Sequence, residues 1–233
     1  MLRYYNLSAS QFLDYLGLNK YIKGKGSDGK RNTRLSMDKQ GIRPEMSDFV
    51  LPYAEFGKEH EIDGLKFYAN YRKKDSSSQH KGKGSEFDFI LGNQKSFEIH
   101  NFEKNDKGSV SLSATPDGLT DCFQSAVEIK CGKLGKDVYT TQEILSKYAT
   151  QIFGQQWVLS TLGYPIKRTH FVNWSFEKRQ VFEIKPCHEY QKYLINELET
   201  YAKHLLDDKE FTRKTPLYNN DLHDKLELIY EED

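Results

Sequence analysis

The segment that most constrains the fold of this chain is residues 113–131, which read SATPDGLTDCFQSAVEIKC. Leading into it, residues 109–114 alternate apolar side chains with serines, the two-residue period of a half-buried strand. The Pro-Asp-Gly sequence that follows predicts a turn and leaves the Asp117 carboxylate at the end of that strand. Residues 126–131, AVEIKC, predict the next strand. The sequence thus predicts a sheet with an acidic turn at the end of one strand.

Glu128 and Lys130 are two residues apart on the second strand, so their side chains share one face. If the strands at 109–114 and 126–131 pair, Asp117 and Glu128 converge beside the Lys130 ammonium. Carboxylates are the hard oxygen ligands that Mg²⁺ and Mn²⁺ prefer, and a nearby lysine can orient or deprotonate a water and offset charge on a phosphate. These three residues form a candidate catalytic core for phosphodiester hydrolysis. The same pattern also arises by chance, as an exposed salt bridge on a strand.

A long, mostly apolar helix is predicted over about residues 141–162, ending at Gly163. Tyr148, Gln151 and Gln155 fall at positions i, i+3 and i+7 and therefore share one face of it. Polar groups on an otherwise buried helix are destabilising unless they are hydrogen-bonded. Ordinary polar contacts in a core are one explanation. A site that holds water and phosphate oxygens explains the stripe better.

The rest of the chain alternates between expected helices, strands and loops. Helices are predicted at 7–21, at about 52–68 and from Pro186 to about 206. Strands are predicted at 87–91, 97–103, 169–174 and 180–185, the last two as a hairpin, and loops at 24–34 and 73–85. This order predicts one mixed α/β (α+β) domain over residues 1–207, followed by a C-terminal extension with an acidic tail at 208–233.

Charge is unevenly distributed, although the formal net charge is zero. Residues 20–43 hold eight Lys or Arg and two Asp, and residues 72–83 hold five basic residues and one Asp. Residues 221–233 hold six acids and one Lys. A neutral total can therefore include a basic face suited to nucleic acid. The alternative is two solvated loops and a frayed acidic end.

Cysteine use and hydropathy favour an intracellular protein. The three cysteines, Cys122, Cys131 and Cys187, form no CxxC pair. That is typical of a reducing compartment and disfavours both a disulfide framework and a zinc or iron–sulfur site. No apolar run approaches the roughly 20 residues that cross a bilayer, and the first residues lack the pattern of a signal peptide. We expect a cytoplasmic or nuclear protein that does not enter a membrane.

Four motifs, in order, resemble the lambda-exonuclease/YqaJ-type recombination nucleases of viruses and phages, within the PD-(D/E)XK superfamily. LSAS at 7–10 with GLNKY at 17–21 resembles the opening segment of that family, and GKEHE at 57–61 resembles its helical GxxxE motif. TPDGL and VEIKC match the core motif, and Tyr148 with Gln151 matches the helix that completes the site. The resemblance runs to roughly residue 200. It implies a restriction-endonuclease-like core, a mixed central sheet flanked by helices.

The resemblance also implies a role for each matched residue. Asp117 and Glu128 would bind metal, joined by Glu61 as a third acid and by the backbone carbonyl of Ile129. Lys130 would be the catalytic lysine, with Tyr148 and Gln151 completing the catalytic site. Ser10 would contact a DNA phosphate and Arg3 would line a pocket for a 5′-phosphate. Further DNA contacts are expected from these residues: Gln155, Lys23, Lys25, Arg31 and Arg34.

The implied activity is Mg²⁺-dependent exonuclease digestion of duplex DNA ends, 5′ to 3′, with two ions per site and Mn²⁺ as a substitute. Relatives of this kind make single-stranded tails for a single-strand annealing protein, and some form a trimeric ring around DNA. A virus- or phage-encoded recombination enzyme is therefore expected.

Two other interpretations stay open. One is another nuclease of the same superfamily: a structure- or sequence-specific endonuclease, or a host-shutoff nuclease that also cuts RNA. The other is a binding module that keeps the fold without cutting. A relative with a four-cysteine iron–sulfur cluster is disfavoured because the chain has three unclustered cysteines.

Overall fold

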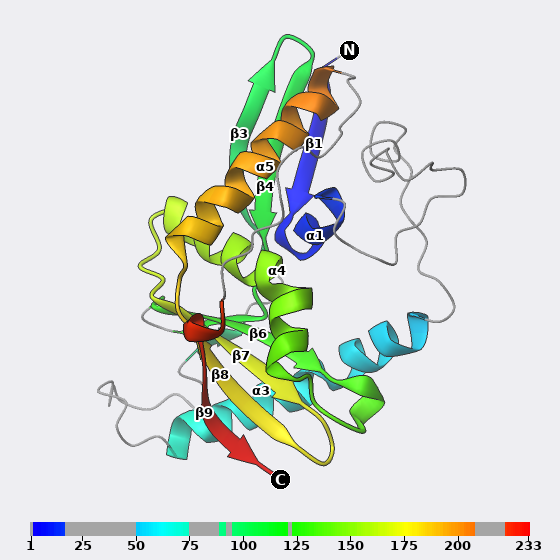
Figure 1. The fold of residues 1–233 in the computed structure, drawn as a ribbon, viewed down its shortest axis with the longest axis vertical. Coiled ribbons are helices and arrows are strands. Elements are labelled where there is room, and N and C mark those ends of the chain that lie inside the picture. The colour runs from blue at the N-terminus through cyan, green and yellow to red at the C-terminus, as the bar shows by residue number, and fades with distance from the viewer. Residues whose placement is uncertain (1, 17–49, 75–88, 92–94, 121–122, 208–221) are drawn as a thin grey trace.

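The computed structural model describes residues 2–16, 50–74, 89–91, 95–120, 123–207 and 222–233. These residues form two separate sheets with helices packed on them, so the prediction of a mixed α/β fold is confirmed (Figure 1). No helix in these ranges is both long and apolar enough to span a membrane.

The larger sheet has six strands in the order β2-β5-β6-β7-β8-β9. Their bounds are β2 Phe89–Leu91, β5 Gly118–Thr120, β6 Ser125–Cys131, β7 Arg168–Trp174, β8 Arg179–Ile184 and β9 Leu226–Glu232. β6 and β7 are parallel, and the other neighbours are antiparallel. The predicted hairpin of β7 and β8 is confirmed. The acidic end of the chain is not frayed, because it forms the edge strand β9 beside β8.

The smaller sheet has the order β1-β4-β3, with β1 Arg3–Ser8, β4 Gly108–Ala114 and β3 Phe97–Asn105. The prediction of a helix starting at residue 7 is wrong, because Leu7 and Ser8 end strand β1. Leu7 lies opposite Leu112 in the parallel pair of β1 and β4, and both side chains are buried. Within the described residues, the short helices η1 (Ala9–Gln11) and α1 (Phe12–Tyr15) follow, and residues 17–21 of the predicted helix lie outside them. Tertiary burial next to β4 thus outweighs the local helical pattern.

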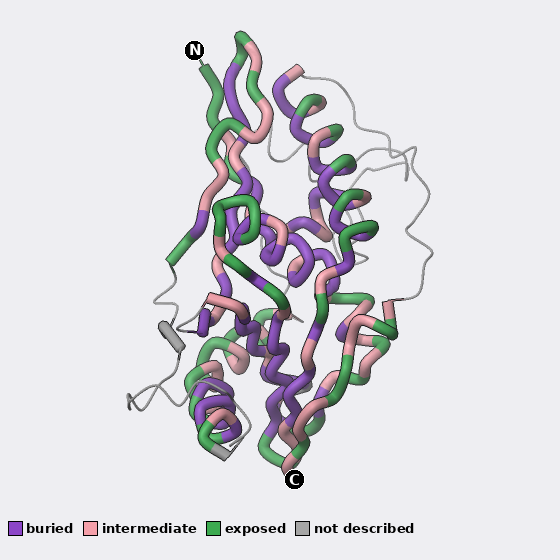
Figure 2. The backbone as a smooth tube through the Cα atoms, turned by 90° about the vertical axis from the view of Figure 1, so that its left-hand side faces the viewer, coloured by how far each residue is buried: buried purple, intermediate pink, exposed green. Residues whose placement is uncertain are grey.

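Three long helices cover the sheets: α3 Leu51–Lys74, α4 Thr141–Thr161 and α5 His188–Asp207. Alternate residues of β6 face two different cores. Val127 and Ile129 pack in a cluster with α3, whereas Ala126 packs in a cluster with α4 and α5. Figure 2 shows the resulting buried band through the central strands and along one side of each helix. β6 is therefore enclosed on both faces, and it carries the acidic motif between α3 and α4.

The contact of α3 with β6 depends on Gly64. A Cβ atom at this position would lie 2.6 Å from Ile129 Cγ2, whereas a Cβ at Gly57 on the same helix would meet nothing within 4 Å. We expect Gly64→Ala to lower the free energy of unfolding by about 1–2 kcal/mol, because overpacking outweighs the gain in helix propensity. Gly57→Ala, the matched control, should raise it by about 0.5–1 kcal/mol. Urea denaturation measures both, and equal stabilisation by the two substitutions would contradict this close packing.

Candidate active site

Asp117 is held at the end of the short strand β5 rather than at the end of β4. β5 pairs with β6 in a register that sets Gly118 opposite Val127 and Leu119 opposite Ala126. Continuing this register by one residue sets Asp117 opposite Glu128. Asp117 Oδ2 accepts a hydrogen bond from the backbone N–H of Ile129 at 2.6 Å. The expectation that β4 pairs with the 126–131 strand is wrong, because β4 belongs to the other sheet, yet the expected convergence of the two acids occurs.

Glu128 is a buried carboxylate whose oxygens are held by three donors. Its side chain is 1% exposed. Gln151 and Lys130 donate to Oε1, and Gln155 donates to Oε2 at 2.8 Å. The polar stripe predicted on the long helix therefore serves a carboxylate on the neighbouring strand. A carboxylate has about four acceptor positions, so Glu128 keeps capacity for one further partner.

Lys130 lies between Glu128 and the ring of Tyr148. Its side chain is 25% exposed, and its Nζ lies 5.5 Å from the centroid of the Tyr148 ring. Burial acts to lower the pKa of Lys130, but the charges of Glu128 and Asp117 outweigh it and hold the pKa above its ordinary value. The ammonium therefore stays protonated and presents a fixed positive charge beside two acids.

A cavity of about 640 Å³ opens beside this group, and the wall opposite β6 is formed by α3. Tyr53, Gly57 and Glu61 follow each other at intervals of four along the helix, so they line one stripe facing the cavity. Glu61 is half-buried and makes no hydrogen bond or ion pair within the described ranges. Asp117, Ile129, Lys130 and Tyr148 form the facing wall. The structure thus brings Glu61 to the same space as the core motif.

The electrostatics of the cavity leave an excess of negative charge near Asp117. Burial, the charge of Glu128 and, to a smaller extent, Glu61 raise the pKa of Asp117 to about 8, although Lys130 and the hydrogen bond from Ile129 act in the opposite direction. An acid held in this way is costly to ionise without a cation close by. The site is therefore short of positive charge.

The donor set suits a hard divalent cation. Asp117, Glu61 and Ile129 line the cavity, and the buried Glu128 carboxylate lies on the strand beside Asp117. Gln155 Oε1 is buried and has no hydrogen-bond partner within the described residues, so this oxygen keeps the capacity to accept. Among the described residues, no group of three or more His, Cys, Asp or Glu is preassembled in a metal-binding arrangement. The fit to Mg²⁺ thus rests on the carboxylates and on the unmet negative charge.

Tyr148 closes the site on the α4 side. Its ring lies 5.4 Å from that of Tyr139 and 5.5 Å from that of Phe171, measured between centroids. Burial, and next the neighbouring Tyr139, raise the pKa of Tyr148 well above its usual range, so the hydroxyl stays protonated. The residue is both a packing aromatic and a wall of the cavity.

Arg3 and Ser10 do not come together. They lie beyond opposite ends of the run from Arg3 to Ser8, which spans about 16 Å at the rise of a strand. Ser10 lies in η1, which packs on α4, and its hydroxyl is 3.0 Å from that of Ser8. Strand β1 thus sets Arg3 and Ser10 apart along the chain, and Lys23, Lys25, Arg31 and Arg34 lie outside the described residues.

Several cavity residues were not singled out from the sequence, among them Tyr53, Lys58, Tyr139 and Lys147. The spacing of Tyr53, Gly57 and Glu61 was an available signal, since residues four apart share a helix face. His60, the neighbour of Glu61 on α3, stacks on Trp174 with ring centroids 5.3 Å apart.

Comparison with known proteins adds no relative from which a role could be transferred. The chain matches none of the protein-family models, curated proteins or solved structures against which it was compared. The functional argument therefore depends on the residues of this cavity.

Proposed function

We propose that this protein is a Mg²⁺-dependent nuclease that hydrolyses phosphodiester bonds of DNA, with a PD-(D/E)XK core formed by β5, β6, α3 and α4. The observation that carries the proposal is the juxtaposition of Asp117, Glu128 and Lys130. Asp117 is bonded to the strand that bears the other two. Asp117 and Lys130 line a cavity that Glu61 also lines, and the buried Glu128 is ion-paired with Lys130. A chance salt bridge on a strand would not gather these partners around one space.

Each residue has a distinct task in this proposal. Asp117, Glu128, Glu61 and the carbonyl of Ile129 would hold the metal, which when bound would activate a water and neutralise charge on the phosphate. Gln151 and Gln155 fix the Glu128 carboxylate, so that its orientation costs little on binding. Lys130 directs a positive charge into the cavity and would orient the water or donate to a phosphate oxygen.

The substrate class follows from the charge and size of the cavity. Besides Lys130, Lys58 and Lys147 line it, so a polyanion meets three ammonium groups at its mouth. The family resemblance suggests digestion of duplex ends from 5′ to 3′, leaving single strands for an annealing protein, with a trimeric ring as the possible assembly. Ser10, on η1 beside α4, is the phosphate contact that we retain from that set.

The experiment that tests the proposal compares a linear duplex bearing 5′-phosphates with the same DNA as a closed circle, both in Mg²⁺. Nucleotides released from the linear form alone would support an end-dependent exonuclease. Cutting of the circle would mean an endonuclease with the same core. If the protein cut neither DNA nor RNA with Mg²⁺ or Mn²⁺, that result would contradict the proposal and favour a binding module.

A further inference from the structure

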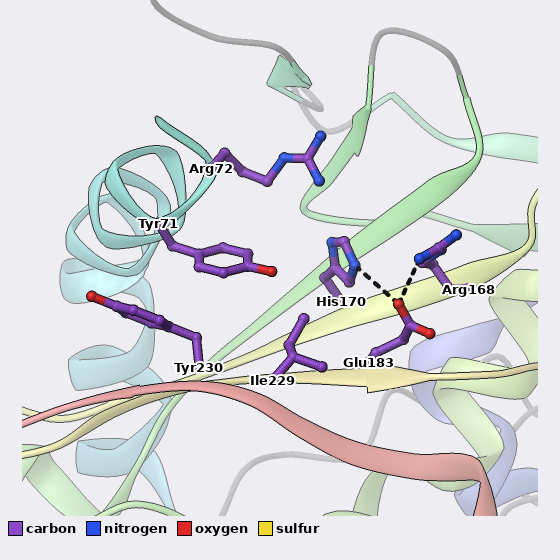
Figure 3. A pocket seen from close by; sticks show the side chains of 7 residues that line it. All are labelled: Tyr71, Arg72, Arg168, His170, Glu183, Ile229 and Tyr230. Carbon is purple, nitrogen blue, oxygen red and sulfur yellow. Dashed lines mark hydrogen bonds and ion pairs between the residues drawn. The ribbon is translucent and has the colours of Figure 1, made fainter. Parts of the chain in front are cut away.

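A second cavity, of about 450 Å³, lies at the other end of α3 from the candidate active site (Figure 3). Glu61 lines the first cavity and Arg72 the second, eleven residues further along the helix, or about 16 Å. The second cavity is open to solvent and is lined by α3, β7, β8 and β9. Its polar and aromatic lining comprises Tyr71, Arg72, Arg168, His170, Glu183 and Tyr230. It shares no residue with the first cavity.

Within the described residues, Arg72 is the cation of this cavity for which no protein partner is found. Its guanidinium extends from the end of α3 toward the cavity in Figure 3. It makes no hydrogen bond or ion pair within the part of the chain that the structure describes, although it is half-buried. A guanidinium carries five N–H donors in a planar fork that matches phosphate or carboxylate oxygens. A partly desolvated arginine without a counter-ion is therefore able to bind an anion.

The acid in the cavity is already neutralised. Glu183 accepts from Arg168 at 2.6 Å, and His170 Nε2 lies 3.9 Å from the same oxygen. His170 is fixed in turn by the Tyr68 hydroxyl, 2.5 Å from its Nδ1. Interaction with His170 and then with Arg168 lowers the pKa of Glu183 to about 2, against the effect of burial. Only one guanidinium nitrogen of Arg168 is used in this pair, so its other N–H groups can reach a second anion.

The charge balance favours an anionic ligand. Burial lowers the pKa of His170, so the imidazole is neutral near pH 7. Arg72 and Arg168 then oppose Glu183 alone, which leaves a net charge of about one positive unit. The remaining walls are aromatic and apolar: the rings of Tyr71 and Tyr230 lie 5.1 Å apart between centroids, tilted by 38°, and Ile229 adds apolar surface. Cations beside aromatic walls suit a phosphate joined to a planar base.

We propose that this cavity binds a nucleotide, its phosphate held by Arg72 and the free N–H groups of Arg168, and its base against Tyr71 and Tyr230. The nucleotide is either a free mononucleotide or one unit of a nucleic-acid strand. The site is separate from the proposed nuclease centre and does not depend on cutting.

The test is calorimetric titration of deoxyadenosine monophosphate into the full chain in EDTA, which prevents cleavage. Arg72→Gln should weaken binding by about tenfold or more, the loss expected for a charge-assisted contact. Lys73→Gln is the matched control, because it removes the same charge from the next residue of α3, which is exposed and does not line the cavity. It should bind as the unsubstituted protein does. Thermal melts of both variants check folding, which Arg72 does not support through any described contact.

The source of the phosphate is resolved by two further probes, inorganic phosphate and a short single-stranded oligonucleotide. Binding of the mononucleotide that weakens in Arg72→Gln supports a free nucleotide. Binding of the oligonucleotide alone, weakened in the same way, supports a unit of a strand. Equal binding of every probe by Arg72→Gln and the unsubstituted protein, or equal weakening by Lys73→Gln, would overturn the proposal. Cutting of the linear duplex in Mg²⁺, measured in parallel, reports on the first cavity, so failure of one site is distinguishable from failure of the other.

Discussion

Replacing Lys130 with alanine is expected to reduce DNA cutting by about 10²–10³-fold or more while binding of DNA changes little. The ammonium is directed into the cavity by its ion pair with Glu128 and by the Tyr148 ring. Removal of one group that stabilises transition-state charge costs about 10²–10³ in rate. Binding is shared among many phosphate contacts, so loss of one charge lowers it only slightly. Initial rates on labelled linear duplex, with affinity measured in Ca²⁺ or EDTA, check both parts.

The substitution also leaves a buried carboxylate without its ion pair, so folding has to be separated from catalysis. Breaking a buried pair by removing one partner destabilises a protein by about 3–5 kcal/mol when both groups are desolvated, and by less here because Lys130 is 25% exposed. Lys130→Gln retains a donor to Glu128 without the charge. It should melt closer to the unsubstituted protein yet cut as poorly as Lys130→Ala.

Lys66→Ala is the matched control for loss of a lysine. Lys66 lies on α3 with 66% of its side chain exposed, 3.5 Å from Asp63, and lines neither cavity. Its replacement should leave cutting unchanged. Normal cutting by Lys130→Gln in a folded protein would show that Lys130 has no catalytic task and that β6 is not the catalytic strand.

The elements that were predictable from sequence are those whose local pattern and tertiary environment agree. β6 carries apolar residues on either side of Glu128. Alternate residues of this strand are buried in two different hydrophobic clusters. α4 begins with a capping box between Thr140 and Glu143, and the chain turns after it at Gly163 with φ +88°. Both elements were expected within one residue of their observed bounds. Local and global preferences point the same way there.

The elements that were missed depend on partners distant in the chain. β1 forms because Leu7 is buried beside Leu112. Nothing in the local sequence of residues 3–8 predicts their parallel pairing with β4, which lies about a hundred residues further along the chain. β5 has only three residues, too few for a periodic pattern. β9 is acidic and half-exposed, which resembles a solvated tail until β8 pairs with it. An edge strand needs burial on one side only, so its composition is weakly constrained.

The candidate site also combines features that the local sequence predicts with features that depend on distant parts of the chain. Asp117 and Glu128 were expected to converge, and they do, although through β5 instead of β4. The stripe on α4 was linked to a site, and Gln151 and Gln155 both hold Glu128. The separation of Arg3 from Ser10 was not predictable, because it depends on β1, a strand that the local sequence did not predict and that extends the chain from Arg3 to Ser8.

Asp117→Asn is expected to abolish binding of Mn²⁺ at the site, seen as loss of the heat of titration in calorimetry. The amide keeps an oxygen that can accept from the Ile129 N–H, so the turn is retained. What it removes is the negative charge, on which a hard cation depends. Unchanged Mn²⁺ heat in a folded Asp117→Asn protein would place the metal elsewhere in the chain.

The same substitution should stabilise the metal-free protein, the opposite of its effect on metal binding. Burial and Glu128 raise the pKa of Asp117 to about 8 from 3.8, so between these values the folded state holds more protons than the unfolded state. Stability contributed by this group is therefore full below pH 4 and falls as the pH rises toward 8. At pH 7.5 a neutral amide avoids that cost, and the melting temperature should rise by about 2–4 °C for each kcal/mol recovered.

Asp63→Asn is a control for which the expected change in melting temperature has the opposite sign. Asp63 accepts from His60 at 3.0 Å and lies 3.5 Å from Lys66, and the interaction with His60 lowers its pKa. Its charge is favourable in the folded state, so its removal should lower the melting temperature slightly and leave the Mn²⁺ heat intact. If Asp117→Asn instead destabilised the metal-free protein as Asp63→Asn does, Asp117 would be a structural acid satisfied by its neighbours. If it raised stability and removed the metal, Asp117 would be an acid retained at the expense of the metal-free fold, as expected of a residue that holds a cation.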